Sequence, residues 1–175
     1  MLVGVVSDTH DYIRGARLAA RLFVEHGVEL VIHLGDIVAP FTLRAMREAG
    51  VKRLIAVYGN NDGEKLLLRQ VAGNLGFEIH EWPYILELGG VKLALIHGYG
   101  SPEYTRRIVE ALAPGVDILL YGHTHEARVE RIEDTLVLNP GEGCGCLTGR
   151  VTAAILDVSR REATIHTLAE REDHL

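Results

Sequence analysis

Short apolar runs alternate with amphipathic stretches in the first half of the chain. The run "LVGVV" precedes a helical pattern from about Tyr12 to His26, and "ELVIHL" precedes a second one near Pro40 to Ala49. A third run, "RLIAV", precedes a helical pattern over roughly Gly63 to Ala72. Strands that alternate with helices predict parallel crossovers.

The pattern changes after Phe77. The segment "YILELGGVKLALI" predicts a hairpin around Gly89-Gly90, and Pro102 to Ala113 predicts a fourth helix. The runs "DILLY", "EARVERI", "TLVLN", "VTAAILDV" and "EATIHTL" then predict strands joined by short turns. We expect the second sheet to be mainly antiparallel. The predicted fold is α/β: a four-layer α/β/β/α sandwich of two packed mixed sheets flanked by helices, in one domain over residues 1–175.

Composition narrows the class of protein. The chain has 175 residues, of which 47% are hydrophobic, enough for a sizeable core. No apolar run approaches the roughly 18 residues of a membrane span, and no secretory signal is visible. Two cysteines, Cys144 and Cys146, are too few for a disulfide framework, so we expect free thiols and a cytoplasmic protein. A net charge of −6 argues against a basic nucleic-acid surface, but bound metal ions could still attract an anionic substrate.

Five buried runs end in the same kind of sequence: "VGVV-SDTH", "ELVIHL-GD", "RLIAV-YGNND", "LALI-HG" and "DILL-YGHTH". Ligand sites of α/β sheets lie beyond the carboxyl ends of the strands, so these endings should meet at one rim. Asp8 and His10 are two residues apart, which in an extended chain places both side chains on the same side. Gly122, before His123, would allow close approach of the backbone. Carboxylate, imidazole and amide ligands without thiolate suit Mn, Fe, Zn or Ni.

These motifs, in this order, resemble those of the calcineurin-like metallophosphoesterases, in their small archaeal and bacterial phosphodiesterase branch. The resemblance implies hydrolysis of phosphate diesters by a hydroxide that bridges two divalent ions, Mn first, with Ni, Fe or Zn as alternatives. Asp36 would bridge the two ions. The further ligands implied are Asp8, His10 and His125 for the first ion and Asn60, His97 and His123 for the second.

Three further positions are expected to contribute to catalysis or substrate binding. Many relatives have a histidine in place of Asn61, and that histidine is thought to protonate the leaving group. Asn61 can hydrogen-bond a phosphate but cannot act as an acid, so we expect activated esters to react well and alkyl esters poorly. Asp62 is expected to orient a ligand histidine. Tyr99 stands where relatives often have histidine and could reach substrate.

Other interpretations remain open from the sequence. Asn60, Asn61 and Asp62 could be turn residues, and His33 is better explained by packing than by metal binding. The same site could serve a phosphomonoesterase or nucleotidase. A non-catalytic scaffold resembling the small retromer subunit is disfavoured, because the full histidine set is present. We expect a small phosphoester substrate, no membrane association and no strong nucleic-acid surface, and homo-oligomers remain open.

Overall fold

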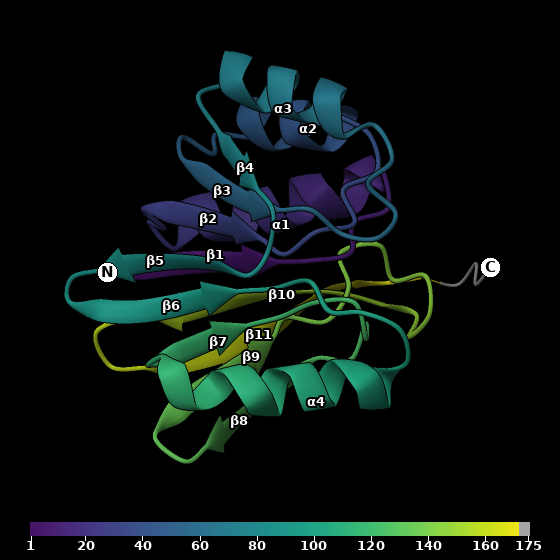
Figure 1. Ribbon diagram of the computed structural model, residues 1–175. Coiled ribbons are helices and arrows are strands. Elements are labelled where there is room, and N and C mark those ends of the chain that lie inside the picture. The colour runs from purple at the N-terminus through teal and green to yellow at the C-terminus, as the bar shows by residue number, and fades with distance from the viewer. Residues whose placement is uncertain (172–175) are drawn as a thin grey trace.

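The computed structural model describes residues 1–171 and has the predicted four layers (Figure 1). Two β-sheets pack face to face, with three helices on the outer face of the first sheet and one on the second. The helices are α1 (Ile13–Glu25), α2 (Phe41–Glu48), α3 (Lys65–Asn74) and α4 (Pro102–Leu112), and α4 runs into a 3₁₀ turn (Ala113–Gly115). All four α-helices lie within about two residues of the predicted bounds.

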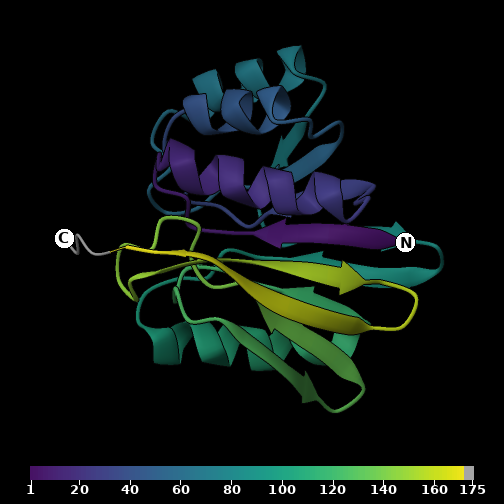
Figure 2. The same cartoon turned by 180° about the vertical axis from the view of Figure 1, so that it is seen from behind.

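The first sheet has six strands in the order β11-β10-β1-β2-β3-β4. Strands β1 to β4 are parallel, and β10 pairs antiparallel with both β1 and β11 (Figure 2). The bounds are β1 (Leu2–Val6), β2 (Leu30–His33), β3 (Leu54–Val57), β4 (Glu78–His80), β10 (Arg150–Asp157) and β11 (Glu162–Glu170). The short edge strand β4 was not predicted.

The second sheet has the order β5-β6-β7-β9-β8. Its bounds are β5 (Tyr84–Leu88), β6 (Val91–Leu95), β7 (Ile118–Leu120), β8 (Arg128–Ile132) and β9 (Thr135–Asn139). The expectation that it is mainly antiparallel is wrong: two of its pairings are parallel and two antiparallel. Helix α4 carries the chain back between β6 and β7, which makes those strands parallel, and β10 and β11 leave to extend the first sheet.

Strand alternation divides the apolar side chains among three cores. Val5 and Leu95 point into the layer between the two sheets. Their sequence neighbours face outward: Val6 packs beneath the helices of the first sheet, and Ala94 packs beneath α4. Within residues 1–171, no helix combines the length and the apolarity that crossing a membrane requires.

The loops that follow six of the parallel strands form one rim of the sandwich, on the right of Figure 1. These strands are β1, β2 and β3 of the first sheet and β6, β7 and β9 of the second. Hydrogen bonds join the loops across the two sheets: the Gly143 amide donates to the Ser7 carbonyl (2.8 Å), and His97 Nδ1 donates to the Leu34 carbonyl (2.7 Å). The rim is therefore one connected structure rather than a set of separate turns.

His33 lies beneath this rim and is fully buried, in agreement with the packing role expected for it. Its Nδ1 accepts a hydrogen bond from the Gly35 amide (3.2 Å), so the Nε2 hydrogen is the one that can donate to Thr9 Oγ1 (3.1 Å). Burial lowers the pKa of His33 to about 3. The imidazole is therefore neutral in the folded protein at ordinary pH.

The buried His33 should make the metal-free protein lose stability as the pH falls from about 6.5 toward 3. In that window the unfolded chain binds a proton on His33 and the folded chain does not, so the free energy of unfolding decreases with falling pH. His33→Gln should flatten the dependence by up to about 1.4 kcal/mol per pH unit, as measured by urea denaturation. His26→Gln, at an exposed histidine, is the control. If the free energy of unfolding varied with pH in the same way in wild type and His33→Gln, His33 would not be the group responsible.

Candidate metal centre

Two carboxylates form the centre of the site. Asp8 follows β1 and Asp36 follows β2, and the two residues are 0% and 1% exposed. Both have left-handed backbone, with φ of 51° and 54°. His10, His123 and His125 are left-handed too, so the extended geometry expected for the Asp8–His10 spacing is wrong. The side chains converge because the chain turns sharply at these residues, a strain typical of functional sites.

Three imidazoles direct Nε2 at these carboxylates. His10 Nε2 lies 3.4 Å from Asp36 Oδ2, and His97 Nε2 lies 3.5 Å from Asp36 Oδ1. His125 Nε2 lies 3.4 Å from Asp8 Oδ1. The imidazoles also fall into two pairs: His10 stacks on His125 with ring centroids 5.3 Å apart, and His97 meets His123 edge-on at 5.1 Å. These pairs correspond to the two ligand groups that the resemblance implies.

The other two predicted ligands are Asn60 and His123, and Asn60 lies beside the second pair of imidazoles. Asn60 Oδ1 is 3.1 Å from His97 Nε2. The His123 amide donates to Asp8 Oδ2 (3.0 Å), while its Nε2 donates to the Gly100 carbonyl (2.7 Å). The structure thus brings together all seven predicted ligands, although His123 Nε2 would have to leave Gly100 before it could bind an ion.

Orphaned polar atoms fit a bound cation at this place. Asp8 Oδ1 and His10 Nε2 are buried, and neither has a hydrogen-bond partner among the described residues. Buried polar atoms are rarely left unsatisfied, because each costs free energy comparable to a lost hydrogen bond. A divalent cation accepts lone pairs from both carboxylate and imidazole. The residues present therefore suit a metal, and the donor set is one that Mn, Fe, Zn and Ni all accept.

The pKa values of the two carboxyl groups are shifted in opposite directions in the protein without metal. Burial is the main influence on Asp8 and raises its pKa, although His97 and His125 oppose this. Burial would also raise the pKa of Asp36, but the hydrogen bond and charge of His97, with two hydrogen bonds from Asn61, hold it well below its usual range. Asp36 is therefore the permanent anion of the site.

Asn61 and Asp62 hold Asp36 from two directions. The Asn61 amide donates to Asp36 Oδ1 and its Nδ2 to Oδ2, both at 2.8 Å. Among the described residues Asp62 makes no hydrogen bond to a histidine, contrary to expectation. Its carboxylate instead accepts from the Asp36 (3.1 Å), Val38 (2.6 Å) and Gly59 (2.7 Å) amides, so it fixes the backbone that carries Asp36. Turn geometry, rather than histidine orientation, is the role of Asp62.

Tyr99 lies at the edge of the site. It is 62% exposed, and its backbone is hydrogen-bonded to Thr105 Oγ1 at the start of α4. No described contact joins its ring to a predicted ligand, so the proposed contact of Tyr99 with substrate stays a prediction.

Glycines allow the loops to pack this closely. A Cβ on Gly122 would lie 2.9 Å from Asp8 Oδ2 and would also clash with Ser7 Oγ. A Cβ on Gly35 would lie 2.7 Å from both the Gly59 amide and His97 Nδ1. The close approach expected at Gly122 is confirmed.

The contact of Glu142 with a predicted ligand was not predicted from the sequence. The buried carboxylate of Glu142 accepts from His125 Nδ1 at 2.6 Å, which leaves Nε2 of that imidazole to face Asp8. It also accepts from the Cys146, Leu147 and Thr148 amides, at 2.6–3.1 Å. Burial would raise the pKa of Glu142, but the hydrogen bonds from His125 and Thr148 outweigh it and lower the pKa to about 2. The signal was available: "TLVLN-PGE" is a sixth strand end that delivers a carboxylate.

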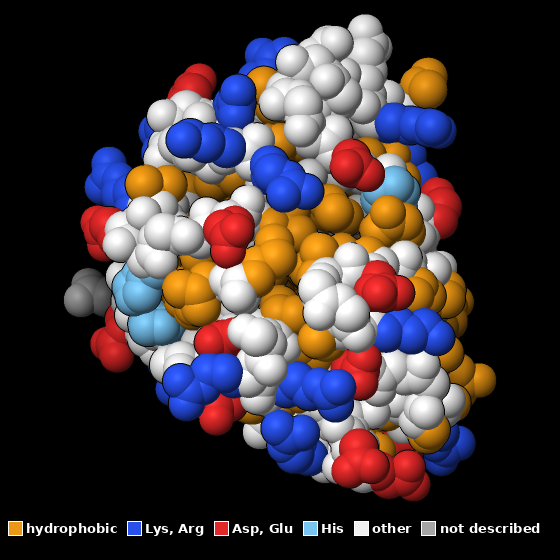
Figure 3. All heavy atoms as spheres, turned by 90° about the vertical axis from the view of Figure 1, so that its left-hand side faces the viewer, with side chains coloured by type: hydrophobic (Ala, Val, Ile, Leu, Met, Phe, Trp, Pro, Cys, Tyr) orange, Lys and Arg blue, Asp and Glu red, His pale blue; other side chains and the backbone are white. Residues whose placement is uncertain are grey.

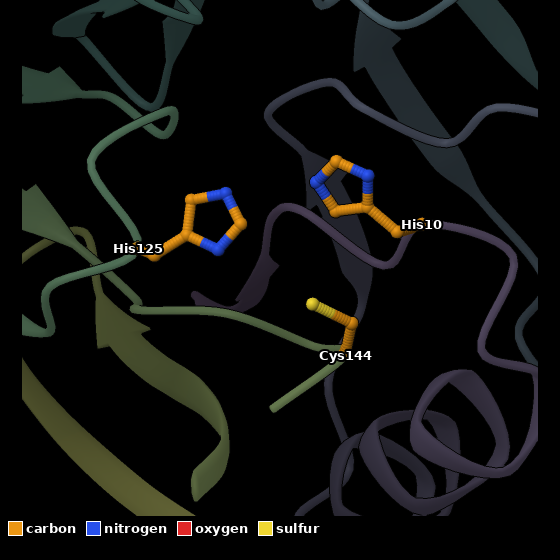
Figure 4. Close-up of side chains that lie close together, drawn as sticks. All are labelled: His10, His125 and Cys144. Atoms are coloured by element: carbon orange, nitrogen blue, oxygen red, sulfur yellow. The ribbon is translucent and has the colours of Figure 1, made fainter. Parts of the chain in front are cut away.

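Cys144 lies next to this contact. Figure 4 shows its sulfur directed toward the space between the His10 and His125 rings, and ligand atoms of these three residues lie within 4.8 Å of one another. Burial raises the pKa of the Cys144 thiol, so it is protonated and donates to Glu142 Oε2 (3.3 Å). Cys144 and Cys146 are both free, as expected.

Comparison with known proteins assigns the chain to a family. Residues 1–161 match the calcineurin-like phosphoesterase superfamily domain, and the protein belongs to that superfamily. A protein named as a phosphodiesterase in Methanocaldococcus jannaschii is 38% identical over 163 residues, which are 93% of this chain and 96% of that protein. The structure of an archaeal phosphodiesterase superimposes with a TM-score of 0.86 at 36% identity, over 96% of this chain and all of that one.

A more distant similarity shows the fold alone. Vacuolar protein sorting 29 from Cryptosporidium parvum superimposes with a TM-score of 0.65 at 18% identity, over 94% of this chain and 95% of that one. The predicted family and four-layer fold are thus both confirmed.

Replacing Glu142 by glutamine should weaken metal binding. In wild type, both carboxylate oxygens of Glu142 accept hydrogen bonds from the surrounding donors. In the glutamine variant, an NH₂ group would replace one of these acceptors and would face the same donors. Because His125 would lose its orientation, we expect an affinity for Mn²⁺ about 10–100-fold lower, measured by competition with a chelating dye. Thr148→Val removes one hydroxyl donor (2.7 Å) but not the His125 contact, and should keep the affinity. If both variants lost the same Mn²⁺ affinity, Glu142 would act only by fixing the loop and not by orienting His125.

Proposed function

We propose that the protein is a metal-dependent phosphodiesterase with a dinuclear centre. The observation that carries the proposal is the convergence of three Nε2 atoms on two buried carboxylates, with Asp8 Oδ1 and His10 Nε2 left orphaned. Asp36 would be shared by both ions. Asp8, His10 and His125 would complete one site, and Asn60, His97 and His123 the other. The relatives named as phosphodiesterases support the diester as substrate.

When bound, the two ions would neutralise phosphoryl charge and acidify a water molecule. The residues of the chain hold the metal ligands in place and position the substrate. Asn61 keeps the Asp36 carboxylate fixed through both its oxygens, and its Nδ2 carries a second hydrogen that could donate to a phosphoryl oxygen. Asn61 cannot supply a proton to a leaving alcohol at neutral pH. The chemistry would thus rely on charge stabilisation more than on acid catalysis.

The proposal predicts metal-dependent hydrolysis of bis(p-nitrophenyl) phosphate. After chelation and return of Mn²⁺, wild type should hydrolyse this diester faster than p-nitrophenyl phosphate. The Asp36→Asn and His97→Ala variants should hydrolyse the diester more than about 100-fold more slowly than wild type, because about 100-fold is the upper end of the loss caused by mutating residues that only support metal ligands. His80→Ala, at a histidine of β4 that stacks on Tyr84 and is outside the predicted ligand set, is the matched control. A preference for the monoester would favour a phosphomonoesterase instead. Bound metal without any turnover would favour a scaffold.

The rate should depend steeply on the leaving group. Without a general acid at Asn61, a diester with an alkyl leaving group should react far more slowly than one that releases p-nitrophenolate. Asn61→His should raise the alkyl rate selectively, toward the roughly 10²–10⁴-fold that acid–base assistance provides. Single-turnover rates for a series of diesters, plotted against the pKa of the leaving alcohol, measure how steeply the rate depends on the leaving group. Equal single-turnover rates for both ester types in wild type would argue that another group donates the proton.

We propose Mn²⁺ as the native metal, with Ni, Fe or Zn as alternatives, because carboxylate, imidazole and amide donors suit all four. Two free thiols support a cytoplasmic location. The substrate would be a small phosphoester, and the net charge of −6 supports neither nucleic-acid binding nor an anionic surface partner.

A homo-oligomer is also part of the proposal. Figure 3 shows apolar side chains gathered on the face at the left of Figure 1, bordered by charged groups, as a self-association surface would be.

A further inference from the structure

A cavity of about 450 Å³ adjoins one side of the metal centre, within the roughly 300–1,000 Å³ range of small-molecule sites. His10 and His125, the stacked pair, form its inner wall. The outer walls include Tyr12, Leu147 and Arg171. A diester has two organic arms beyond its phosphate, and the assigned ligands account only for the phosphate.

Leu147 is the apolar contact that this cavity offers. It is 71% exposed, and a single exposed leucine is by itself ordinary. Its backbone, however, is fixed: the Leu147 amide donates to both oxygens of the buried Glu142, each at 3.1 Å. The amides on either side of it, of Cys146 and Thr148, bond to the same carboxylate. A leucine held at a cavity wall by a rigid loop binds a ligand with little loss of conformational entropy.

Tyr12 and Arg171 form a flat wall. The guanidinium carbon of Arg171 lies 4.5 Å from the centre of the Tyr12 ring. An Arg171 side-chain nitrogen donates to the Cys144 carbonyl (3.0 Å), and its own amide donates to Gly149 (2.7 Å). A planar guanidinium fixed in this way can also stack on an aromatic ligand.

The charges of the cavity favour a neutral arm. Arg171 brings one positive charge to the lining, and Asp11 brings one negative charge. The charges of the lining outside the metal ligands therefore balance, and an uncharged ring would meet an aliphatic side chain, a planar cation and two imidazoles.

We propose that this cavity binds one arm of the diester and selects a neutral aromatic arm over a small alkyl one. The inference rests on the proposed phosphodiesterase function. Because the cavity borders His10 and His125 rather than His97 and His123, the arm would orient the substrate with respect to the two metal positions.

The test compares methyl phenyl phosphate with dimethyl phosphate as competitive inhibitors of bis(p-nitrophenyl) phosphate hydrolysis by the Mn²⁺-loaded full chain. Neither carries a nitrophenyl leaving group, and they differ in one arm. In wild type the inhibition constant should be at least about 10-fold lower for the phenyl compound, since a single methylene in an apolar pocket is worth about 10–200-fold.

Leu147→Ser should reduce this preference to about 2–3-fold, while the inhibition constant of dimethyl phosphate stays unchanged and reports an intact phosphate site. Leu147→Phe should retain the preference. Leu66→Ser is the control, because Leu66 is 83% exposed on α3 and does not line this cavity.

Equal inhibition by both compounds in wild type would overturn the proposal. So would a Leu147→Ser variant that weakens both compounds alike, because the loop would then act on the phosphate site. Wild type that neither hydrolyses diesters nor binds dimethyl phosphate in the presence of metal would instead refute the proposed function, and the arm site with it.

Discussion

The burial of two carboxylates at the junction of two sheets is the constraint on which the rest of this structure depends. Asp8 and Asp36 leave water almost completely, and removing a charge from water is costly unless partners replace the lost hydration. The partners come from both sheets: His97 follows β6 and His125 follows β7, while Asn61 follows β3. The register of the strands, the close-packed glycines and the connected loops all serve to bring these donors within reach. Folding and assembly of the metal centre are, in this sense, one problem.

The backbone shows where that problem is hardest. Left-handed residues other than glycine gather in the rim loops, and Val38, a β-branched residue, adopts φ of 74°. Such a conformation persists only where the surroundings impose it. At Val38 the imposing contact is the hydrogen bond from its amide to Asp62, which also holds the Asp36 and Gly59 amides. One carboxylate thereby shapes the turn that presents another.

Local patterns carried most of the information about the fold and the ligands. Apolar runs with polar endings identified the strands and the side chains at their ends, because each run is buried and each ending lies at the rim. The pairing of the second sheet could not be predicted, since whether β10 joins β9 or β1 depends on packing between distant segments. The partners of Asp62 were missed for a related reason: three backbone amides from two crossing loops meet it, and no side-chain pattern encodes them. The contact of Glu142 with His125 was not predicted because "NPGE" also fits an ordinary turn.

The loop after β9 illustrates how a site can change its preferences. A single carboxylate, that of Glu142, holds both a ligand imidazole and the backbone of residues 146–148. Those backbone bonds do not depend on which side chain position 147 bears. If position 147 contacts substrate as proposed, mutation there would change substrate preference while the inherited reaction centre stays intact.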